Sequence, residues 1–168
     1  FEGSDSHATA YILTKAIKKV GDYDLVFCGR QAADWDEGIV GSLIAENLGL
    51  PLITMAGAID VADGELRVKR TTLDGYQVFA VPMPALVTIS NEVGQPRLPS
   101  GWGIISAARK QFPVWDADDI DIDPLQVGAS AARRKLVKLF SPERARKCEV
   151  VEEKSADEAS VKLATRLI

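Results

Sequence analysis

The chain has 168 residues, of which 46% are hydrophobic and 26% charged, as is ordinary for a globular domain. The formal net charge of −4 argues against nucleic-acid binding, and no apolar run approaches the ~20 residues of a membrane span, so we expect no stable membrane insertion. Two cysteines, Cys28 and Cys148, do not make a disulfide framework, which fits a reducing compartment.

The first predicted element is a helix over residues 4–20. Apolar residues recur there at helical spacing behind the capping residues Ser4 and Asp5, and Gly21 follows at the end. A short apolar run at 24–28 then predicts a buried strand.

A polar turn and a second helix follow this strand. The apolar pattern predicts a helix over 36–48, with Asp34 and Asp36 as candidate N-cap residues. Gly49 followed by Pro51 is typical of a helix C-terminus. This helix–strand–helix alternation is typical of a parallel sheet.

The middle of the chain predicts further strands. They are expected at 51–61, in a hairpin over 65–81 with an Asp-Gly turn at Asp74, and at 85–89. We therefore expect an α/β fold with a mostly parallel sheet and an antiparallel hairpin.

The composition of the chain changes after residue 90, and less regular structure is predicted there. A loop rich in Pro and Gly spans 91–103, and a short helix is expected at 103–110. The acidic stretch 114–122 predicts a strand or extended segment with a solvated face, since it lacks the glycine and glutamate of a calcium loop. An extended arm follows over 124–154, and Ser155 with Glu158 forms a capping box that opens a final helix.

The turn 29–41 is the main candidate site. Its spacing does not decide between an ordinary strand–helix connection and a nucleotide cradle. In a cradle, Gly29 and Ala32 permit close backbone approach, Asp34 accepts from a ribose hydroxyl, and N–H groups from Gly38 to Gly41 meet phosphate. The standard dinucleotide and P-loop glycine patterns are absent.

The same stretch carries a family resemblance. Cys-Gly-Arg-Gln-Ala-Ala-Asp-Trp-Asp from Cys28 to Asp36, with Gly41 and the tail from Ala45 to Pro51, resembles the adenine-nucleotide segment of the electron transfer flavoprotein β subunit. It is most similar to the nitrogen-fixation-associated and electron-bifurcating branch. Matching blocks occur in the same order at 4–10, 95–110 and 136–142.

The resemblance implies a Rossmann-like, adenine-nucleotide-hydrolase-like sheet and an electron carrier without catalytic or metal-binding residues. It implies FAD shared with an α subunit, and AMP or a second FAD in this chain's own site. The implied cofactor-binding residues are Gly29, Arg30, Gln31, Ala32, Asp34, Asp36, Gly38, Ile39, Val40 and Gly41. The family often has Gln and then Thr or Val where this chain has Ile39 and Val40, so phosphate contacts there must come from the backbone.

Partners follow from the same resemblance. It implies an α subunit, wrapped by the arm, and dehydrogenases that dock on a recognition loop. The implied docking residues are Arg97, Trp102, Ile104 and Ile105, although Gly101 stands where the family usually has Leu.

We expect a nucleotide-binding domain over 1–123 and an arm with its helix over 124–168, in a prokaryotic cytoplasmic protein.

Two further expectations stay open at this stage. Family members carry a stretch before the helix that starts at Ser4, so the chain is expected to be the C-terminal two-thirds of a longer protein. The alternative functions are a universal-stress-like ATP- or AMP-binding α/β domain without a redox role, and an interaction domain with a vestigial nucleotide site.

Overall fold

The structure is a computed structural model that describes residues 1–141 and 150–167, so Pro142 and Cys148 lie outside the described residues. The chain divides into two compact units, Phe1–Lys135 and Leu136–Ile168, which are described separately. The first unit contains α1 (Ser6–Val20), β1 (Leu25–Gly29), α2 (Val40–Leu48), β2 (Leu52–Ala62), β3 (Glu65–Thr72), β4 (Gly75–Pro82), β5 (Ala85–Ile89) and α3 (Gly101–Ala108), with 3-10 turns at Asn91–Val93 and Pro124–Gln126.

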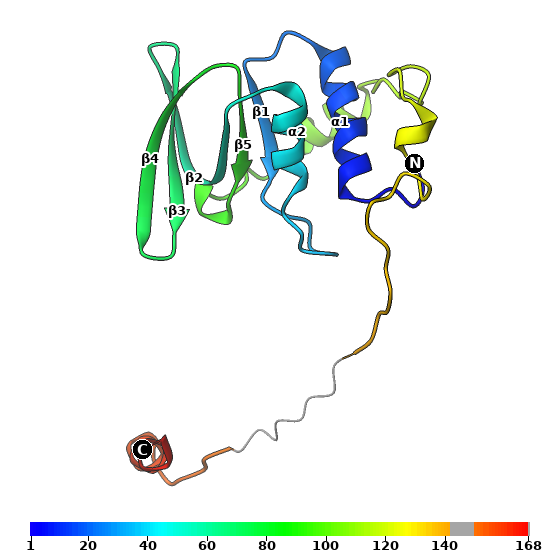
Figure 1. Ribbon diagram of the computed structural model, residues 1–168. Helices are drawn as coiled ribbons and strands as arrows, with labels where there is room; N and C mark the ends of the chain where they lie inside the picture. The colour runs from blue at the N-terminus through cyan, green and yellow to red at the C-terminus, as the bar shows by residue number, and fades with distance from the viewer. Residues whose placement is uncertain (142–149, 168) are drawn as a thin grey trace. The chain divides into compact units, whose positions relative to one another are not determined.

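The five strands form one mixed sheet in the order β1-β5-β2-β3-β4 (Figure 1). β1, β5 and β2 are parallel, whereas β2, β3 and β4 are antiparallel. The strands predicted between residues 24 and 89, including the hairpin, are all present, but the expectation of a mostly parallel sheet is wrong. The reason is that β2 is long: its start pairs with β5, and from Ala56 onward it pairs with the hairpin.

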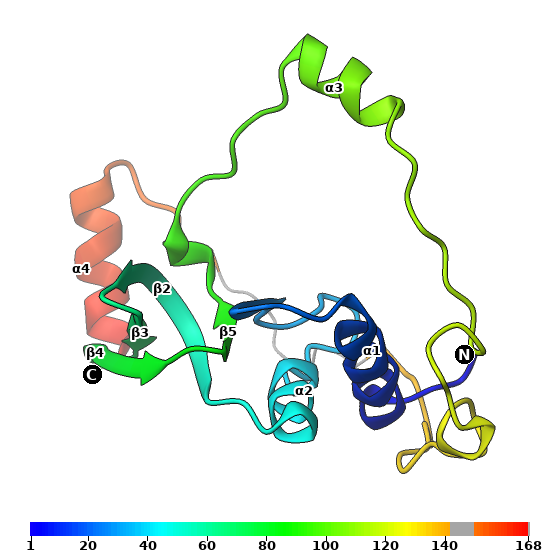
Figure 2. The ribbon, with the colours of Figure 1, turned by 90° about the horizontal axis from the view of Figure 1, so that it is seen from above.

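The side chains of the sheet belong to two hydrophobic clusters. Helices α1 and α2 lie on the same side of β1 and β5 (Figure 2), where Ala10, Ile44 and Leu86 are buried together. The hairpin supplies Leu66 and Val68 to a second cluster that also contains Val87. β1 and β5 therefore have side chains in both cores, which explains their continuous apolar sequences.

Helix α1 begins as predicted. Asp5 is its N-cap, and the Asp5 carboxylate accepts from the Ala8 N–H at 3.0 Å. The helix ends at Gly21, whose φ is 63°.

Helix α2 begins four residues later than predicted, and the aspartates do not cap it. Its N-cap position is Ile39, and in the part of the chain that the structure describes no side chain caps the helix. Asp36 has a φ of 57° and Gly38 a φ of 66°, so this backbone is left-handed rather than helical. The C-terminus is as predicted, with Gly49 left-handed and the Leu50 N–H bonded to the Ala45 carbonyl at 2.9 Å.

Within the acidic stretch 114–122, residues 117–121 form a turn and no residue is in a strand, so the prediction of a strand or extended segment is wrong for its centre. Asp116 and Asp119 each accept from the other's backbone N–H at 3.0 Å. The Ile122 N–H bonds the Ala117 carbonyl, and Asp121 has a φ of 53°. Aspartate side chains that bond nearby backbone groups compete with sheet pairing, and here they favour the turn.

Residues 115–134, here called the return segment, run back along α1 from its C-terminal to its N-terminal end. The contacts in chain order are Trp115 and Asp119 with Lys19, Asp123 with Tyr11, Gly128 with Ser4, and Arg133 with Asp5. The sequence predicts that residues 124–154 are ordered mainly by packing against another chain. For residues 128–134 that prediction is wrong, because Gly128 and Arg133 bond to Ser4 and to the N-cap residue Asp5 of this chain.

The short helix α3 starts two residues before its predicted range, capped by Ser100, whose hydroxyl accepts from the Gly103 N–H. None of its residues is buried. In the second unit, α4 (Ala156–Leu167) begins at the predicted cap, where Ser155 accepts from the Glu158 N–H at 3.2 Å. No helix of the described residues is long and apolar enough to cross a membrane.

Candidate functional site

The connection from β1 to α2 leaves the sheet at the carboxyl ends of its parallel strands. The Arg30 N–H donates to the Ile89 carbonyl at 3.1 Å, so the connection starts beside the end of β5. Carboxyl ends of parallel strands are where open α/β sheets bind ligands. The topology therefore places the predicted loop at the edge of the sheet where a ligand site is expected.

The N-terminus of α2 is open to an anion. The first intrahelical bond runs from the Leu43 N–H to the Ile39 carbonyl, so the N–H groups of Val40, Gly41 and Ser42 have no acceptor within the helix. No side chain of the described residues caps them. These donors and the helix dipole favour a phosphate or carboxylate at this end. The Val40 N–H is therefore available for a phosphate contact that the apolar side chains of Ile39 and Val40 do not offer.

The three glycines of the connection have different environments. A Cβ added to Gly29 meets nothing within 4 Å, so open space lies beside the end of β1. Gly38 needs its left-handed φ of 66°. A Cβ on the buried Gly41 would lie 2.8 Å from the Thr88 Cγ2 and 3.3 Å from the Cys28 Cβ. Gly41 thus lets α2 approach the sheet closely, a packing role that the sequence did not predict.

The predicted polar residues of the loop are mostly exposed. The Asp34 carboxylate accepts from the Trp35 N–H at 2.7 Å, and Asp36 accepts from the Gln31 side chain. The Ala32 carbonyl accepts from the Asp36 N–H at 3.1 Å, which closes a tight turn. Asp34 therefore keeps its second carboxylate oxygen available for a hydroxyl donor.

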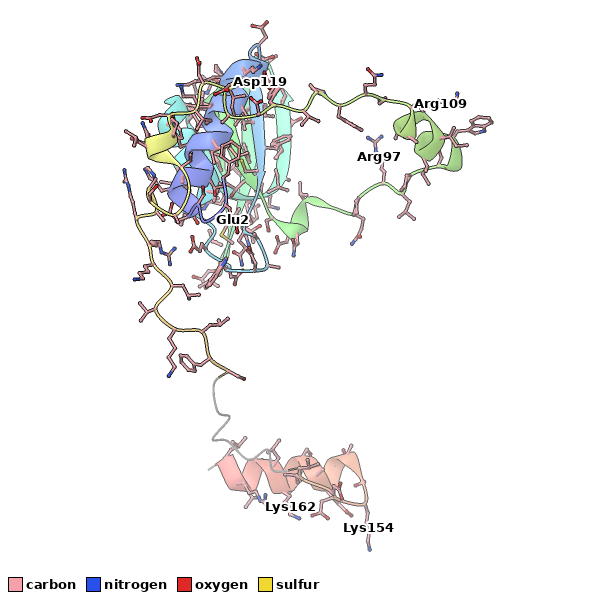
Figure 3. The ribbon with its side chains drawn as sticks, turned by 90° about the vertical axis from the view of Figure 1, so that its right-hand side faces the viewer. Glu2, Arg97, Arg109, Asp119, Lys154 and Lys162 are labelled. Atoms are coloured by element: carbon pink, nitrogen blue, oxygen red, sulfur yellow. The ribbon has the colours of Figure 1, made fainter. Side chains whose placement is uncertain are left out.

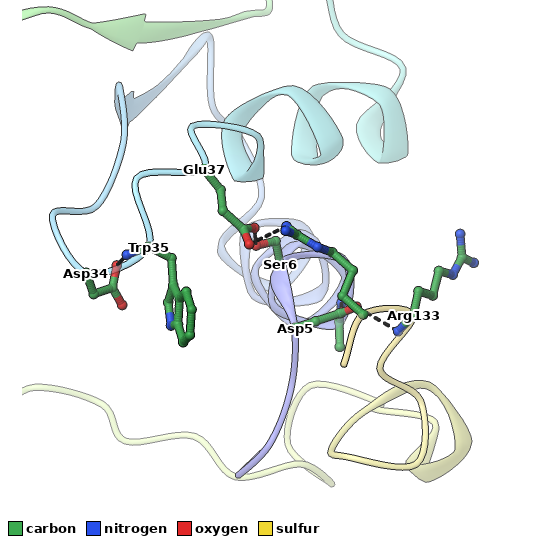
Figure 4. Close-up of polar contacts among 8 residues, drawn as sticks. Asp5, Ser6, Asp34, Trp35, Glu37 and Arg133 are labelled. Atoms are coloured by element: carbon green, nitrogen blue, oxygen red, sulfur yellow. Dashed lines mark hydrogen bonds and ion pairs between the residues drawn. The ribbon is translucent and has the colours of Figure 1, made fainter. Parts of the chain in front are cut away.

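Glu37, which was not among the predicted site residues, connects the loop to two other parts of the chain. Its carboxylate accepts from the Ser6 hydroxyl and the Arg134 guanidinium (Figure 4). Among residues 31–39 it alone is half-buried, and the others are exposed. No sequence signal identified it, because the two donors lie 31 and 97 positions away.

Carboxylates already occupy the N-terminus of α1. Burial raises the pKa of Asp5, but hydrogen bonds from four backbone N–H groups, including Ala8 and Arg133, outweigh it and hold the pKa below its ordinary value. Figure 4 shows Asp5 and Glu37 near the start of this helix. Of the two helices beside the sheet, α2 therefore has the end that is free for an external anion.

A distorted stretch of β2 adjoins the packing around Gly41. Met55 has a left-handed φ of 59°, and its N–H donates to the Thr88 hydroxyl at 3.0 Å. The register between β2 and β5 shifts at this point. Nearby at the end of β5, the buried Ser90 hydroxyl has no partner among the described residues. Burial raises the pKa of the Cys28 thiol at the end of β1, so this cysteine stays protonated near neutral pH.

The predicted docking residues lie together on or near α3. Trp102, Ile104 and Ile105 are on the helix, with exposed fractions of 82%, 56% and 46%. Arg97 precedes the helix and Arg109 follows it, on a segment that extends away from the sheet (Figure 3). A helix with no buried residue exposes an apolar surface of a kind that marks interaction sites.

A shallow cavity of about 510 Å³ lies elsewhere, between α1 and the return segment. Its lining residues are Tyr11, Lys15, Asp118, Asp121, Ile122 and Asp123. None of them is a predicted site residue, and the cavity is not part of the candidate site.

The fold and the open strand–helix junction define an α/β domain suited to an anionic ligand. The electron transfer flavoprotein domain family matches residues 1–120, and the chain belongs to this family.

Its relatives include electron transfer flavoprotein β subunits. That of Thermoanaerobacterium thermosaccharolyticum is 39% identical over 151 residues, covering 89% of this chain and 58% of the relative. That of Clostridium acetobutylicum is 36% identical over 167 residues, covering 99% and 64%. The caffeyl-CoA reductase-Etf complex subunit CarD of Acetobacterium woodii is 39% identical over 142 residues, covering 84% and 54%. The chain thus spans less than two thirds of the length of these relatives.

Proposed function

We propose that this chain is a β-type subunit of an electron transfer flavoprotein that binds AMP or a second FAD at the 29–41 connection. In this role it helps to carry electrons between dehydrogenases and an acceptor, with a further FAD shared with an α-type subunit. The flavin supplies the redox chemistry, and the protein supplies binding, orientation and electrostatics. Family membership and the similarity to electron transfer flavoprotein β subunits support the carrier role.

The uncapped start of α2 is the observation that carries the proposed site. A nucleotide phosphate fits the free N–H groups of Val40, Gly41 and Ser42. The open space beside Gly29 admits the ligand, and the exposed Asp34 carboxylate suits a ribose hydroxyl. These residues therefore fit an adenine nucleotide, held through backbone donors more than through side chains.

Partner binding is proposed for two surfaces. The α3 surface, with Arg97, Trp102, Ile104 and Ile105, would dock dehydrogenases. The arm would bind the α-type subunit through Leu136, Val137, Leu139 and Phe140, whose exposed fractions lie between 56% and 93%. Exposed aliphatic and aromatic anchors of this kind are enriched in interface cores.

The test is to identify the nucleotide in the full-length protein purified with its α-type subunit. Mass spectrometry of the released ligand distinguishes AMP from FAD, and a flavin absorption band separates the carrier from a universal-stress-like ATP-binding domain. The double variant Gly29→Val with Asp34→Ala should lose most of the nucleotide while it remains folded. Unchanged nucleotide content in that variant would refute the assignment of the site.

A further inference from the structure

We propose that Glu37 is a positioning residue for the nucleotide loop, residues 30–39, and that Arg134 connects this loop to the part of the arm that leads to Leu136. The inference rests on the proposed nucleotide function and goes beyond it, because Glu37 and Arg134 are not among the residues expected to touch the ligand. Its basis is the Ser6–Glu37–Arg134 cluster, in which three distant parts of the chain meet (Figure 4).

The loop has few other connections to the body of the domain. Its first residue, Arg30, is fixed by the end of β5. The bonds between Gln31 and Asp36, and between Ala32 and Asp36, stay within the loop. Among the described residues, Glu37 is the only loop residue whose side chain hydrogen-bonds to another element, since Ser6 is the first residue of α1 and Arg134 ends the return segment. The position of the loop relative to α1 therefore depends on this carboxylate.

The cluster also offsets an unfavourable charge. The loop carries three carboxylates, Asp34, Asp36 and Glu37, against Arg30. An anionic ligand at α2 would be repelled by a free Glu37. The positive end of α1 and the Arg134 guanidinium both compensate the charge of Glu37 where the structure holds it. The same contacts thus orient the loop and make it less negative.

The partner-binding part of the arm directly follows this cluster in the chain. Arg134 precedes Lys135, the last residue of the first unit, and the proposed partner-binding anchors begin at Leu136. A partner that holds the arm would therefore restrict Arg134 and favour its bond to Glu37. By thermodynamic linkage, nucleotide binding and partner binding should then each strengthen the other.

Four variants separate positioning from charge: Arg134→Ala, Glu37→Gln, Arg133→Ala and the exchange Glu37→Arg with Arg134→Glu. Arg133→Ala is the matched control, since it removes the same charge one residue away and keeps the backbone N–H that bonds Asp5. If the cluster acted through charge alone, Glu37→Gln would strengthen binding of AMP, and Arg133→Ala would weaken it as much as Arg134→Ala does.

If Glu37 and Arg134 act by positioning the loop, the variants should differ in nucleotide affinity in another way. The affinities are measured by calorimetric titration of AMP, and separately of FAD, into the nucleotide-stripped full-length complex. Arg134 is 62% exposed, so Arg134→Ala and Glu37→Gln should each weaken binding about two- to fivefold. Arg133→Ala should leave binding unchanged, and the exchanged pair should recover part of the loss. Equal affinities for wild type, Arg134→Ala and Glu37→Gln would overturn the proposal.

Hydrogen exchange provides a readout that does not need a nucleotide. In the ligand-free complex, peptides covering 30–39 should exchange faster in Glu37→Gln and Arg134→Ala, while peptides from β5 keep their protection. If the wild type binds neither AMP nor FAD, the proposed function fails, and the exchange data still decide whether Glu37 orders the loop. Identical exchange of 30–39 in all variants would refute its positioning role.

Discussion

Replacement of Gly41 by alanine should destabilise the sheet domain, although alanine is the better helix former. The new methyl would lie 2.8 Å from the Thr88 Cγ2 and 3.3 Å from the Cys28 Cβ, on a residue that is buried against β5. Overpacking of a tight core costs about 1–3 kcal/mol, and the gain in helix propensity offsets up to about 1 kcal/mol. For an overpacking cost near the middle of that range, about 2 kcal/mol, the expected net loss is about 1–2 kcal/mol.

A second substitution tests whether this contact is the cause. Thr88→Ser removes the methyl that clashes and keeps the hydroxyl that accepts from the Met55 N–H. Alone, it should cost about 1 kcal/mol for the lost buried methyl. Combined with Gly41→Ala it should cost less than the sum of the two, because the added methyl fills the space that the removed one leaves.

The assay is urea denaturation of the full-length protein and its variants, with Gly29→Ala as the matched control. A Cβ at Gly29 contacts nothing, so that variant should stay within about 0.5 kcal/mol of wild type. Gly41→Ala should also lower the melting temperature by about 2–8 °C for a domain of this size. Wild-type stability of Gly41→Ala, or additivity of the Gly41 and Thr88 changes within about 0.3–0.5 kcal/mol, would refute the packing argument.

Three further predictions concern α1, the arm and α3. Asp5→Ala should lose about 1 kcal/mol of stability at pH 7, the usual value of an N-cap. Since the folded pKa of Asp5 is depressed, the difference from wild type should shrink as the pH falls below 3.8. Truncation after Lys135 should abolish association with the α-type subunit in co-purification and leave the melting temperature unchanged, whereas truncation after Asp123 should also lower it by removing the bonds to α1. Trp102→Ala should slow electron transfer from a dehydrogenase at low partner concentration, without changing nucleotide content or melting temperature.

Local signals account for the elements that sequence analysis predicted. Asp5 at the start of α1 and Gly49 at the end of α2 act within one turn of their own helices, so the neighbouring sequence is sufficient to identify them. The hairpin is similar, since its turn and its alternating strands are adjacent in sequence. Such features are encoded by residues that contact near neighbours.

The errors come from residues whose roles depend on distant partners. Asp36 resembles an N-cap in sequence, but its carboxylate bonds Gln31 and its backbone is left-handed. β2 continues past the parallel sheet because the hairpin offers a second partner from Ala56 onward. Gly41 is needed because Thr88 packs against it. Thr88 lies 47 positions further along the chain, so no local sequence pattern predicts this role of Gly41.

The start of α1 shows how these long-range contacts bear on the site. Asp5 and Glu37 both place carboxylates there, and each also accepts from the return segment, through the Arg133 N–H and the Arg134 guanidinium. A helix end filled by the chain's own carboxylates does not compete for an external anion. The parallel helix α2 starts nearby without a cap. The contacts that fasten the return segment to α1 therefore also leave α2 as the helix end available for a phosphate, which links the order of that segment to the selectivity of the proposed site.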